Sequence, residues 1–272
     1  MPDSPADNAL TSTEYWQDEF WQIGETEIPS LELDIHNLEY RELHQFLKTH
    51  LPHAESLRLL ELGCHPGRFL WYFHTHFGYQ VDGVEYVKPA CHLTQAALDA
   101  HQIPAKIHHA DFFEFEPPDD SYDIVFSAGL VEHFVDVLPA IRSHARLAKQ
   151  GGYVVIVIPN HAGLNGAILK RLDREVYDAH NHMSYRDLKS ACDQIPELEF
   201  VTGGYLSRFN LSPSNYFQHK LNTWPLWWYK VVFKLYAITV RVAQLLPNTR
   251  WLSPNTILIA RKTGSTEPEE AE

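Results

Sequence analysis

The sequence predicts an α/β fold with a doubly wound, mostly parallel, seven-stranded sheet of the Rossmann-like type and an amphipathic helical segment inserted before the last strand. Two observations predict it. Short runs rich in valine, isoleucine and leucine, such as YVVIVIP at 153–159, alternate with helix-length segments. Such runs are typical of parallel strands buried on both faces. In addition, about 50 residues lie between Tyr205 and Thr256, far more than a loop usually holds, so this segment needs structure of its own.

The N-terminal part is expected to comprise a disordered stretch, 1–12, and a helical cap or lid, 13–52. Residues 1–12 are polar and acidic and contain proline, a composition that cannot bury enough apolar surface to fold. They carry neither a basic stretch nor an apolar run, so no secretory signal is expected. The aromatic segment TEYWQDEFWQIGETEIP, 13–29, follows, and apolar residues at helical spacing continue as far as Leu51.

The α/β core is expected at 53–205, with a last strand at 255–263 and a disordered acidic tail at 264–272. Right-handed crossovers between parallel strands make the sheet doubly wound, and a ligand then binds beyond the carboxyl ends of the strands. The predicted strands are 58–62, 80–85, 105–109, 123–127, 153–158, 199–205 and 256–261, and the predicted helices are 67–76, 89–101, 139–149 and 184–194.

Residues 206–254 are predicted to be an aromatic helical insertion. Its centre, 224–247, has a basic and polar helical face formed by Lys230, Lys234, Arg241 and Gln244, and an apolar face formed by Trp228, Val232, Leu235, Val242 and Leu246. This pattern indicates an interfacial helix that contacts anionic lipid, rather than a membrane-spanning one. A cap over the acceptor pocket and a homodimer contact are the alternatives.

Charge and cysteine content limit the classes of function. The net charge of −13 argues against nucleic-acid binding, which needs clustered lysine and arginine, so a small or lipidic substrate fits better. The three scattered cysteines argue against a disulfide framework or a zinc knuckle, and we expect a cytoplasmic protein with membrane association through 224–247 as an alternative. The 17 histidines form close pairs, but none has the H-E-x-x-H signature, so we interpret them as surface or supporting residues.

A glycine loop, ELGCHPGRF at 61–69, follows the first predicted strand. It is not a phosphate-binding P-loop, because Arg68 and Phe69 stand where that motif has lysine and serine or threonine. A dinucleotide fingerprint needs a middle glycine, and this chain has His65 there, followed by Pro66, which lacks an N–H. An NAD(P)-dependent oxidoreductase is therefore the alternative, not the preferred, interpretation.

Three carboxylates favour a different ligand. Glu61 at the loop would repel a pyrophosphate and attract an α-ammonium group. Glu85 closes the second strand, where it can accept hydrogen bonds from both hydroxyls of a ribose. Asp111 closes the third strand, where it can accept from an exocyclic amine while a neighbouring phenylalanine packs on a purine. Ammonium, ribose and adenine without a pyrophosphate describe S-adenosyl-L-methionine.

The segments ELGCHPGRF, GVEYV, ADFFEF and YDIVFSAGLVEHF resemble, in order and spacing, class I S-adenosylmethionine-dependent methyltransferases over residues 57–159. Where most members have a middle glycine, this chain has His65, which either reshapes the loop or reaches the methionine carboxylate. The resemblance implies that the loop with Gly63, Cys64, His65 and Gly67 surrounds the methionine part, that Glu85 and Tyr86 meet the ribose, that Asp111 and Phe112 hold the adenine, and that Ser127 and Ala128 lie beside the sulfonium.

Methyl transfer from a sulfonium is an in-line displacement with a neutral leaving group, so positioning supplies much of the rate. His133 is the candidate base; alternatively it hydrogen-bonds loop backbone and shapes the pocket. The Glu132-His133 dyad is also similar to that of ubiquinone-pathway O-methyltransferases, in which an upstream glutamate joins it around a divalent metal. Gly129 stands at that upstream place here, so metal dependence is the less favoured alternative and we assign no metal ligand.

The acceptor pocket is expected from the parts of the chain outside these motifs. Tyr15, Trp16 and Trp21 form either a lid or a hydrophobic staple. The candidate acceptor-binding residues are Glu132, Asn160, His161, His180 and His182. The predicted function is methyl transfer from S-adenosyl-L-methionine to a small or lipid-linked hydrophobic acceptor, with oxygen as the first choice of acceptor atom. A non-catalytic methyltransferase-like scaffold that binds a partner or membrane through 224–247 is a further alternative.

Overall fold

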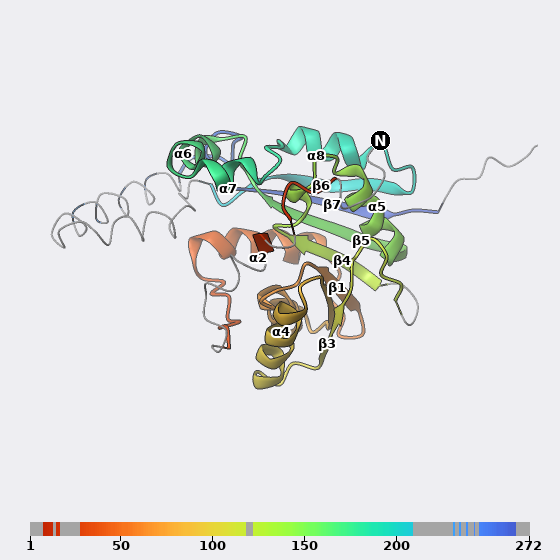
Figure 1. Cartoon of the computed structure of the whole chain (residues 1–272). Coiled ribbons are helices and arrows are strands. Elements are labelled where there is room, and N and C mark those ends of the chain that lie inside the picture. Colours follow the sequence, from red (N-terminus) through yellow and green to blue (C-terminus); the bar gives the residue numbers. More distant parts are fainter. Residues whose placement is uncertain are drawn as a thin grey trace, which may run out of the picture.

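The computed structural model describes residues 8–12, 15–16, 28–117, 122–208, 231, 234, 238, 242 and 245–264. Seven strands form one sheet in the order β3-β2-β1-β4-β5-β7-β6 (Figure 1). All neighbouring pairs are parallel except those of β7, which runs antiparallel to β5 and β6. The strands are β1 Arg58–Leu62, β2 Gln80–Glu85, β3 Ala105–His109, β4 Tyr122–Ala128, β5 Ala148–Pro159, β6 Leu198–Leu206 and β7 Asn255–Lys262. The prediction of a doubly wound, mostly parallel, seven-stranded sheet is confirmed.

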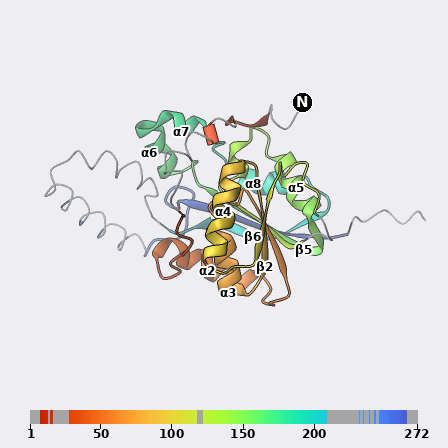
Figure 2. The same ribbon diagram turned by 60° about the horizontal axis from the view of Figure 1, so that its bottom comes forward.

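Helices cover both faces of the sheet (Figures 1 and 2). Helices α2, α3 and α4 pack on one face, and α5 and α8 pack on the other. The described helices are α2 Leu38–His50, α3 Arg68–Phe77, α4 Lys88–Ala100, the 3-10 turn η2 Val131–His133, α5 Leu138–Leu147, α6 Leu164–Leu172, α7 Arg174–Asp178 and α8 Tyr185–Cys192. α6 and α7, which the sequence did not predict, lie side by side after the carboxyl end of β5 (Figure 1).

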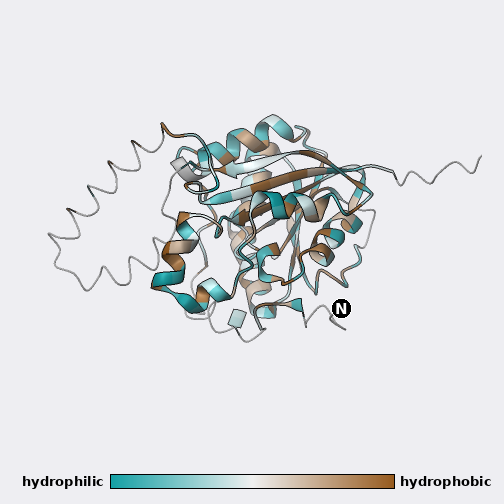
Figure 3. Cartoon of the chain, turned by 90° about the horizontal axis from the view of Figure 1, so that it is seen from above, coloured by the Kyte–Doolittle hydropathy of each residue, from teal (hydrophilic) through white to brown (hydrophobic). Residues whose placement is uncertain are grey.

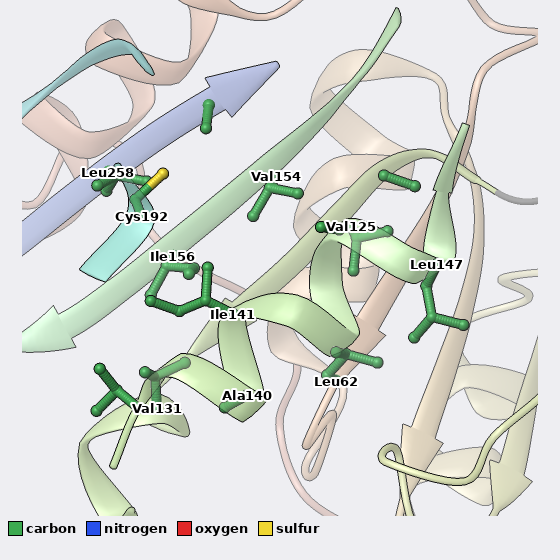
Figure 4. Close-up of a cluster of buried hydrophobic side chains, with 14 of the residues drawn as sticks. Leu62, Val125, Val131, Ala140, Ile141, Leu147, Val154, Ile156, Cys192 and Leu258 are labelled. Carbon is green, nitrogen blue, oxygen red and sulfur yellow. The ribbon is translucent and has the colours of Figure 1, made fainter. Parts of the chain in front are cut away.

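The alternation of side chains along each strand divides the core into two layers. In β1, Leu60 and Leu62 face α5 and α8, whereas Leu59 faces the side of α2, α3 and α4. Figure 4 shows part of the first layer, where Val125 of β4 and Val154 of β5 pack against α5. Coloured by hydropathy, the central strands are the most apolar part of the fold (Figure 3). Both faces of the central strands are therefore buried, as parallel strands require.

Residues 8–12 differ from the expected disordered N-terminus. Ala9 forms an antiparallel bridge with Phe134, and the Leu10 N–H donates to the His133 carbonyl at 2.7 Å. Backbone pairing of this kind needs no apolar side chain, which explains why composition gave no sign of it. Of the expected tail at 264–272, residues 265–272 lie outside the described residues.

Most of the predicted insertion lies outside the described residues, including Trp228, Lys230, Val232, Leu235, Arg241 and Gln244. Its described positions 231, 234, 238 and 242 are helical and exposed. Val231, Ile238 and Val242 have 42%, 57% and 61% of their surface exposed, and Leu245 has 84%. In the part of the chain that is described, no helix has the length and apolar character needed to cross a membrane.

Candidate active site

A cavity of about 550 Å³ lies at the carboxyl ends of β1, β2 and β4. This is the edge at which ligands of doubly wound sheets bind, and the volume falls in the usual range of small-molecule sites. The structure brings many of the predicted residues together around it. The cavity is lined, among others, by Trp16, Gly63, His65, Glu85, Tyr86, Asp111, Phe112, Ala128 and His133.

The glycine loop needs its two glycines for conformational reasons. Gly63 has φ +67° and Gly67, which precedes α3, has φ +95°, and both values lie in the left-handed region that other residues avoid. A Cβ on Gly63 would stand 3.2 Å from Leu130, which lines the same cavity. The Gly63 N–H donates to the Val84 carbonyl at 2.9 Å, so the loop is tied to the end of β2.

His65 is held by α4. Its Nδ1–H is shared between the Thr94 hydroxyl at 2.9 Å and the Ala90 carbonyl at 3.2 Å. Burial lowers the pKa of the imidazole, so the neutral ring is favoured. The ring therefore attaches the loop to α4 while it also lines the cavity.

Glu85 is positioned by backbone N–H groups. One carboxylate oxygen accepts from Val87 N–H at 2.9 Å and the other from His65 N–H at 3.3 Å. Burial raises its pKa, and these hydrogen bonds oppose the rise. Since each carboxylate oxygen has a second lone pair, both can still accept a hydroxyl from the cavity.

Asp111 and Phe112 begin an aromatic wall. One Asp111 oxygen accepts from Phe113 N–H at 2.9 Å, which fixes the turn after β3. The rings of Phe112 and Phe113 lie 4.2 Å apart, and Phe134 meets Phe113 edge-on at 5.3 Å. Phe113 and Phe134 also line the cavity, although the sequence analysis did not include them. Phe113 belongs to the motif ADFFEF, which contains Asp111, and Phe134 belongs to VEHF, which contains His133. The same two motifs could therefore have indicated them.

Four predicted cofactor residues are not in the cavity wall: Glu61, Cys64, Gly67 and Ser127. Glu61 is only 3% exposed, and burial raises its pKa well above the ordinary value, opposed by the Leu70 backbone N–H at the start of α3. The Cys64 sulfur lies 2.5 Å from where a Cβ on Gly83 would be, so it packs behind the loop against β2. Strand alternation in β1 places the Glu61 side chain on the same face as that of Leu59, toward α3.

Ser127 is directed into the α5 layer of the core rather than into the cavity. The His144 Nδ1–H donates to the Ala140 carbonyl at 2.7 Å, so Nε2 is unprotonated and accepts from the Ser127 hydroxyl at 2.9 Å. Burial lowers the pKa of His144 to about 4, which keeps the ring neutral. The neighbouring Ala128 lines the cavity instead.

Residues near the N-terminus form one side of the cavity. Ala9, Thr11 and Ser12 line it together with Trp16, whose indole N–H donates to the Thr11 hydroxyl at 2.9 Å. The Trp16 ring meets the His133 ring edge-on at 4.7 Å, and Tyr15 packs on Trp16 at 5.4 Å. The sequence analysis included Tyr15 and Trp16 but not 9–12. Trp21 lies outside the described residues.

Glu132 and His133 sit on η2 beside the cavity, and both are buried. The His133 Nδ1–H donates to the Ala179 carbonyl at 3.0 Å, and burial together with His180 lowers the pKa of His133 to about 3. Burial raises the pKa of Glu132 to about 8. The backbone hydrogen bond that the sequence analysis offered as the alternative role of His133 is present.

The remaining candidate residues lie beyond η2. The rings of His133 and His180 are 4.5 Å apart, those of His180 and His161 are 4.6 Å apart, and His182 stacks on Tyr177 at 3.7 Å. These histidines therefore gather in one cluster, which the scattered pairs in the sequence did not reveal. Asn160, next to His161 in the chain, is fully buried, and its side-chain amide bonds the segment before β7 instead: it donates to the Arg250 carbonyl at 2.7 Å and to the Ser253 carbonyl at 2.8 Å.

The cavity fits S-adenosyl-L-methionine by its size and by the groups that face it. Glu85 offers two acceptor oxygens for a ribose, Asp111 has a second oxygen for an amine, and Phe112 presents a ring beside it. At Gly63, which has no side chain, the backbone of the loop itself borders the cavity.

Comparisons with known proteins agree with this geometry. A family model described as "Methyltransferase domain" matches residues 35–195, more than half of the chain. No curated protein is significantly similar to the chain in sequence.

Solved structures share the fold at low sequence identity. A protein assigned as a sarcosine dimethylglycine methyltransferase from Galdieria sulphuraria is 15% identical, with a TM-score of 0.56 over 81% of this chain and 83% of that one. The YcgJ protein of Bacillus is 18% identical, with a TM-score of 0.55 over 83% of this chain and 99% of that one. Phosphoethanolamine N-methyltransferase 2 of Haemonchus contortus, bound to phosphomonomethylethanolamine and S-adenosylhomocysteine, is 16% identical, with a TM-score of 0.55 over 81% of this chain and 52% of that one.

The matched region contains the glycine loop, Glu85, Asp111 and η2, which form the cavity. The chain therefore belongs to the methyltransferase-domain family and is an S-adenosyl-L-methionine-dependent methyltransferase.

Proposed function

We propose that this methyltransferase acts on a hydroxyl group of a small or lipid-linked hydrophobic molecule. The observation that carries the proposal is the chemistry of the cavity wall. Beyond Glu85 and Asp111, which we assign to the nucleoside of the cofactor, the wall is formed largely by apolar and aromatic side chains such as Trp16, Leu130 and Phe134. Among the described residues, no lysine or arginine lines it, so a phosphate or carboxylate on the acceptor would find no cationic partner there.

The cofactor supplies a methyl group on a sulfonium, and the protein has to hold the acceptor oxygen in line with it. Gly63 and Ala128 leave space at the strand ends, and Ala9, Thr11, Ser12 and Trp16 form another part of the cavity wall. His133 faces this space with its Nδ1 already bonded to Ala179, so its Nε2 carries the lone pair. That nitrogen can accept a hydrogen bond from the acceptor hydroxyl and orient it, which is the role we assign to His133.

The acceptor class is tested by radiolabelled methyl transfer into a cell extract, followed by separation of organic and aqueous phases. We expect label in the organic phase, in a product whose methyl group is released by ether cleavage and not by mild base. Label confined to charged aqueous products would contradict the proposal. Binding of S-adenosyl-L-methionine in calorimetry without transfer to any extract component would favour the scaffold alternative.

We propose further that 224–247 contacts a membrane surface, as a peripheral site for a lipid-linked acceptor. The exposed apolar residues Val231, Ile238, Val242 and Leu245, with the exposed Lys234 among them, support this proposal. The test is flotation with anionic liposomes. Wild-type protein should float, and the double variant Lys230→Glu with Lys234→Glu should not, since basic residues near anionic lipid contribute about 1 kcal/mol each. A protein that never floats would support the cap or homodimer alternatives.

A further inference from the structure

Three side chains beside the cavity form a group of which the proposed methyl transfer uses only His133, the one that lines the cavity. Glu132 and His133 lie on η2, and His180 lies after α7. One ligand atom from each of the three residues lies within 4.8 Å of those of the other two. Among the described residues, no other group of three or more histidine, cysteine, aspartate or glutamate side chains is close enough to share a metal ion.

The backbone holds these side chains in place from two sides. The segment 179–181 is hydrogen-bonded to 132–135: Asn181 N–H donates to the Glu132 carbonyl at 2.6 Å, and the Asn181 side-chain amide donates to the Phe134 and Val135 carbonyls, both at 3.0 Å. The His133 bond to Ala179 adds a fourth link. The site is therefore built between two segments that are distant in sequence and fixed to each other.

The hydrogen bonds also determine which ring nitrogens can bind a ligand. The Nδ1 of His133 lies 3.0 Å from the Ala179 carbonyl, and the Nδ1 of His180 lies 2.6 Å from the Val176 carbonyl. Because a carbonyl oxygen only accepts, each Nδ1 carries the proton, and Nε2 has the lone pair in each neutral ring. Histidines that bind metals are held in this way, with the second nitrogen donating to a carbonyl or carboxylate.

Glu132 provides a second, independent indication of a ligand. Its side chain is 1% exposed, and one of its carboxylate oxygens is buried without a hydrogen-bond partner among the described residues. A buried polar atom without a partner costs free energy unless something satisfies it. A cation bound beside His133 and His180 would satisfy this oxygen.

We propose that Glu132, His133 and His180 bind one divalent transition-metal cation of the zinc type. Two imidazoles and one carboxylate are the ligands that zinc and its neighbours prefer, whereas magnesium and calcium prefer oxygen ligands throughout. Zinc bonds of about 2.0–2.1 Å in a tetrahedron place ligand atoms about 3.4 Å apart. Side-chain movements of roughly 1 Å would bring the ligand atoms of this group to that separation.

Three protein ligands leave a coordination position open, as in catalytic zinc sites. His133 lines the cavity, so that position faces the space assigned to the acceptor. A cation there would take the Nε2 lone pair of His133 and would itself hold the acceptor oxygen. This role rests on the proposed function, whereas binding of the cation does not.

The test is titration of the chelator-treated full chain with Co²⁺, whose visible absorption reports a site with nitrogen ligands. Wild-type protein should bind one Co²⁺, and Zn²⁺ should displace it. Glu132→Gln and His180→Ala should weaken Co²⁺ binding by more than the roughly 10- to 100-fold that loss of an outer partner of a metal site costs. His182→Ala is the matched control and should bind Co²⁺ like wild type, because His182 lies in the same cluster but stacks on Tyr177.

Absence of Co²⁺ absorption in wild type, or equal binding by wild type and the folded Glu132→Gln variant, would overturn the proposal. Melting temperatures confirm that each variant is folded. Binding of S-adenosylhomocysteine in the same samples separates the two proposals. If the protein binds Co²⁺ but not S-adenosylhomocysteine, the metal site is supported and the assignment of the cavity to the cofactor is contradicted. If it binds S-adenosylhomocysteine but not Co²⁺, only the metal site is contradicted.

Discussion

Glu85 is held in place by the protein itself, since its two carboxylate oxygens accept from Val87 and His65 N–H groups. Glu85→Gln replaces one acceptor by an NH₂ group, which faces a backbone donor and cannot accept a ribose hydroxyl. We expect affinity for S-adenosylhomocysteine to fall roughly 10- to 150-fold, since a hydrogen bond to a charged group contributes about 1.5–3 kcal/mol. Calorimetry measures this. Glu116→Gln is the control, because the Glu116 side chain is 82% exposed and pairs with Arg146 at the surface. Unchanged affinity in Glu85→Gln would refute the ribose assignment.

At the residue scale, the sequence located the groups whose position depends on a strand end or a local turn. Glu85 and Asp111 each follow a strand, and Gly63 follows β1, so their place at the ligand edge could be predicted. Ser127 could not be separated from Ala128, because only the tertiary contact with His144 shows that its hydroxyl faces the core. The proximity of His180 to Glu132 could not be predicted either, because it depends on hydrogen bonds between segments distant in sequence.

At the scale of elements, Asn8 attaches the N-terminal segment to the loop after η2. Its side chain donates to the Asp136 carbonyl at 2.6 Å and accepts from Asp136 N–H at 2.7 Å, and its carbonyl accepts from Val135 N–H at 2.8 Å. Asn8→Ala removes both side-chain bonds at a buried position, so the segment should detach more often. We expect amide exchange at Leu10 and Val135 to become at least about tenfold faster, because each lost bond contributes about 1 kcal/mol.

The exchange experiment contains its own control. The amide of Cys91 in α4 should keep its protection in Asn8→Ala, since no backbone hydrogen bond among the described residues joins α4 to residues 8–12. Affinity for S-adenosylhomocysteine should decrease in the same variant, because Ala9 and Thr11 line the cavity. Unchanged exchange at Leu10 would show that the backbone bridge between Ala9 and Phe134 suffices without Asn8.

Helix α8 begins with a capping box that makes its stability depend on pH. The Asp187 carboxylate accepts from the Ser184 N–H at 2.8 Å and from its hydroxyl at 2.7 Å, and these bonds lower the pKa of Asp187. A carboxyl group whose folded pKa is depressed stabilises the fold above its ordinary pKa and loses that contribution as pH falls through the folded value.

Asp187→Asn should therefore lower the melting temperature at pH 7 by about 2–4 °C, the effect of roughly 1 kcal/mol in a domain of this size. The difference from wild type should shrink as pH falls below about 4, where the wild-type carboxyl also takes up a proton. Thermal unfolding followed by circular dichroism between pH 7 and pH 3.5 checks this. A difference that stays constant over this range would mean that the charge of Asp187 does not contribute.

Element existence was easier to predict than element length. The sequence located every strand of the sheet, and the rules of chain connection predicted a doubly wound, mostly parallel sheet without giving the strand order. β5 begins at Ala148, five residues before the apolar run, because the register with β4 shifts between Tyr122 and Ile124 and lets polar residues join the strand. α6 and α7 were missed: α7 has only five residues and none of them is buried, and α6 buries a single apolar side chain, that of Leu169.

At the scale of the whole molecule, the chain leaves the core after β6 and returns before β7 at almost the same point. Ser207 N–H donates to the Glu42 carboxylate at 2.8 Å, the Asn248 side chain donates to the same carboxylate, and Arg208 N–H donates to Asn248 at 2.7 Å. Leu206 and Asn255 are paired residues of adjacent antiparallel strands. The segment 209–247 therefore enters and leaves the core at neighbouring positions.

Replacing 209–247 by a short glycine and asparagine loop should leave the fold intact, because a tight turn can join such neighbouring positions. We expect the shortened protein to unfold cooperatively, to keep its affinity for S-adenosylhomocysteine within about threefold, and to lose flotation with anionic liposomes. Loss of the nucleoside site in a folded shortened protein would show that the segment belongs to the cavity and would support the cap alternative.

The position of β7 has a consequence for how the chain folds during synthesis. Of the seven strands of the sheet, β7 is the last to leave the ribosome, yet it lies between β5 and β6 in the finished sheet. Until then, β5 presents an unpaired edge of valine and isoleucine, the kind of edge at which chains aggregate. The nascent chain thus passes through a state that can fold its nucleoside-binding half but is still prone to self-association, and release of the last strand ends that exposure.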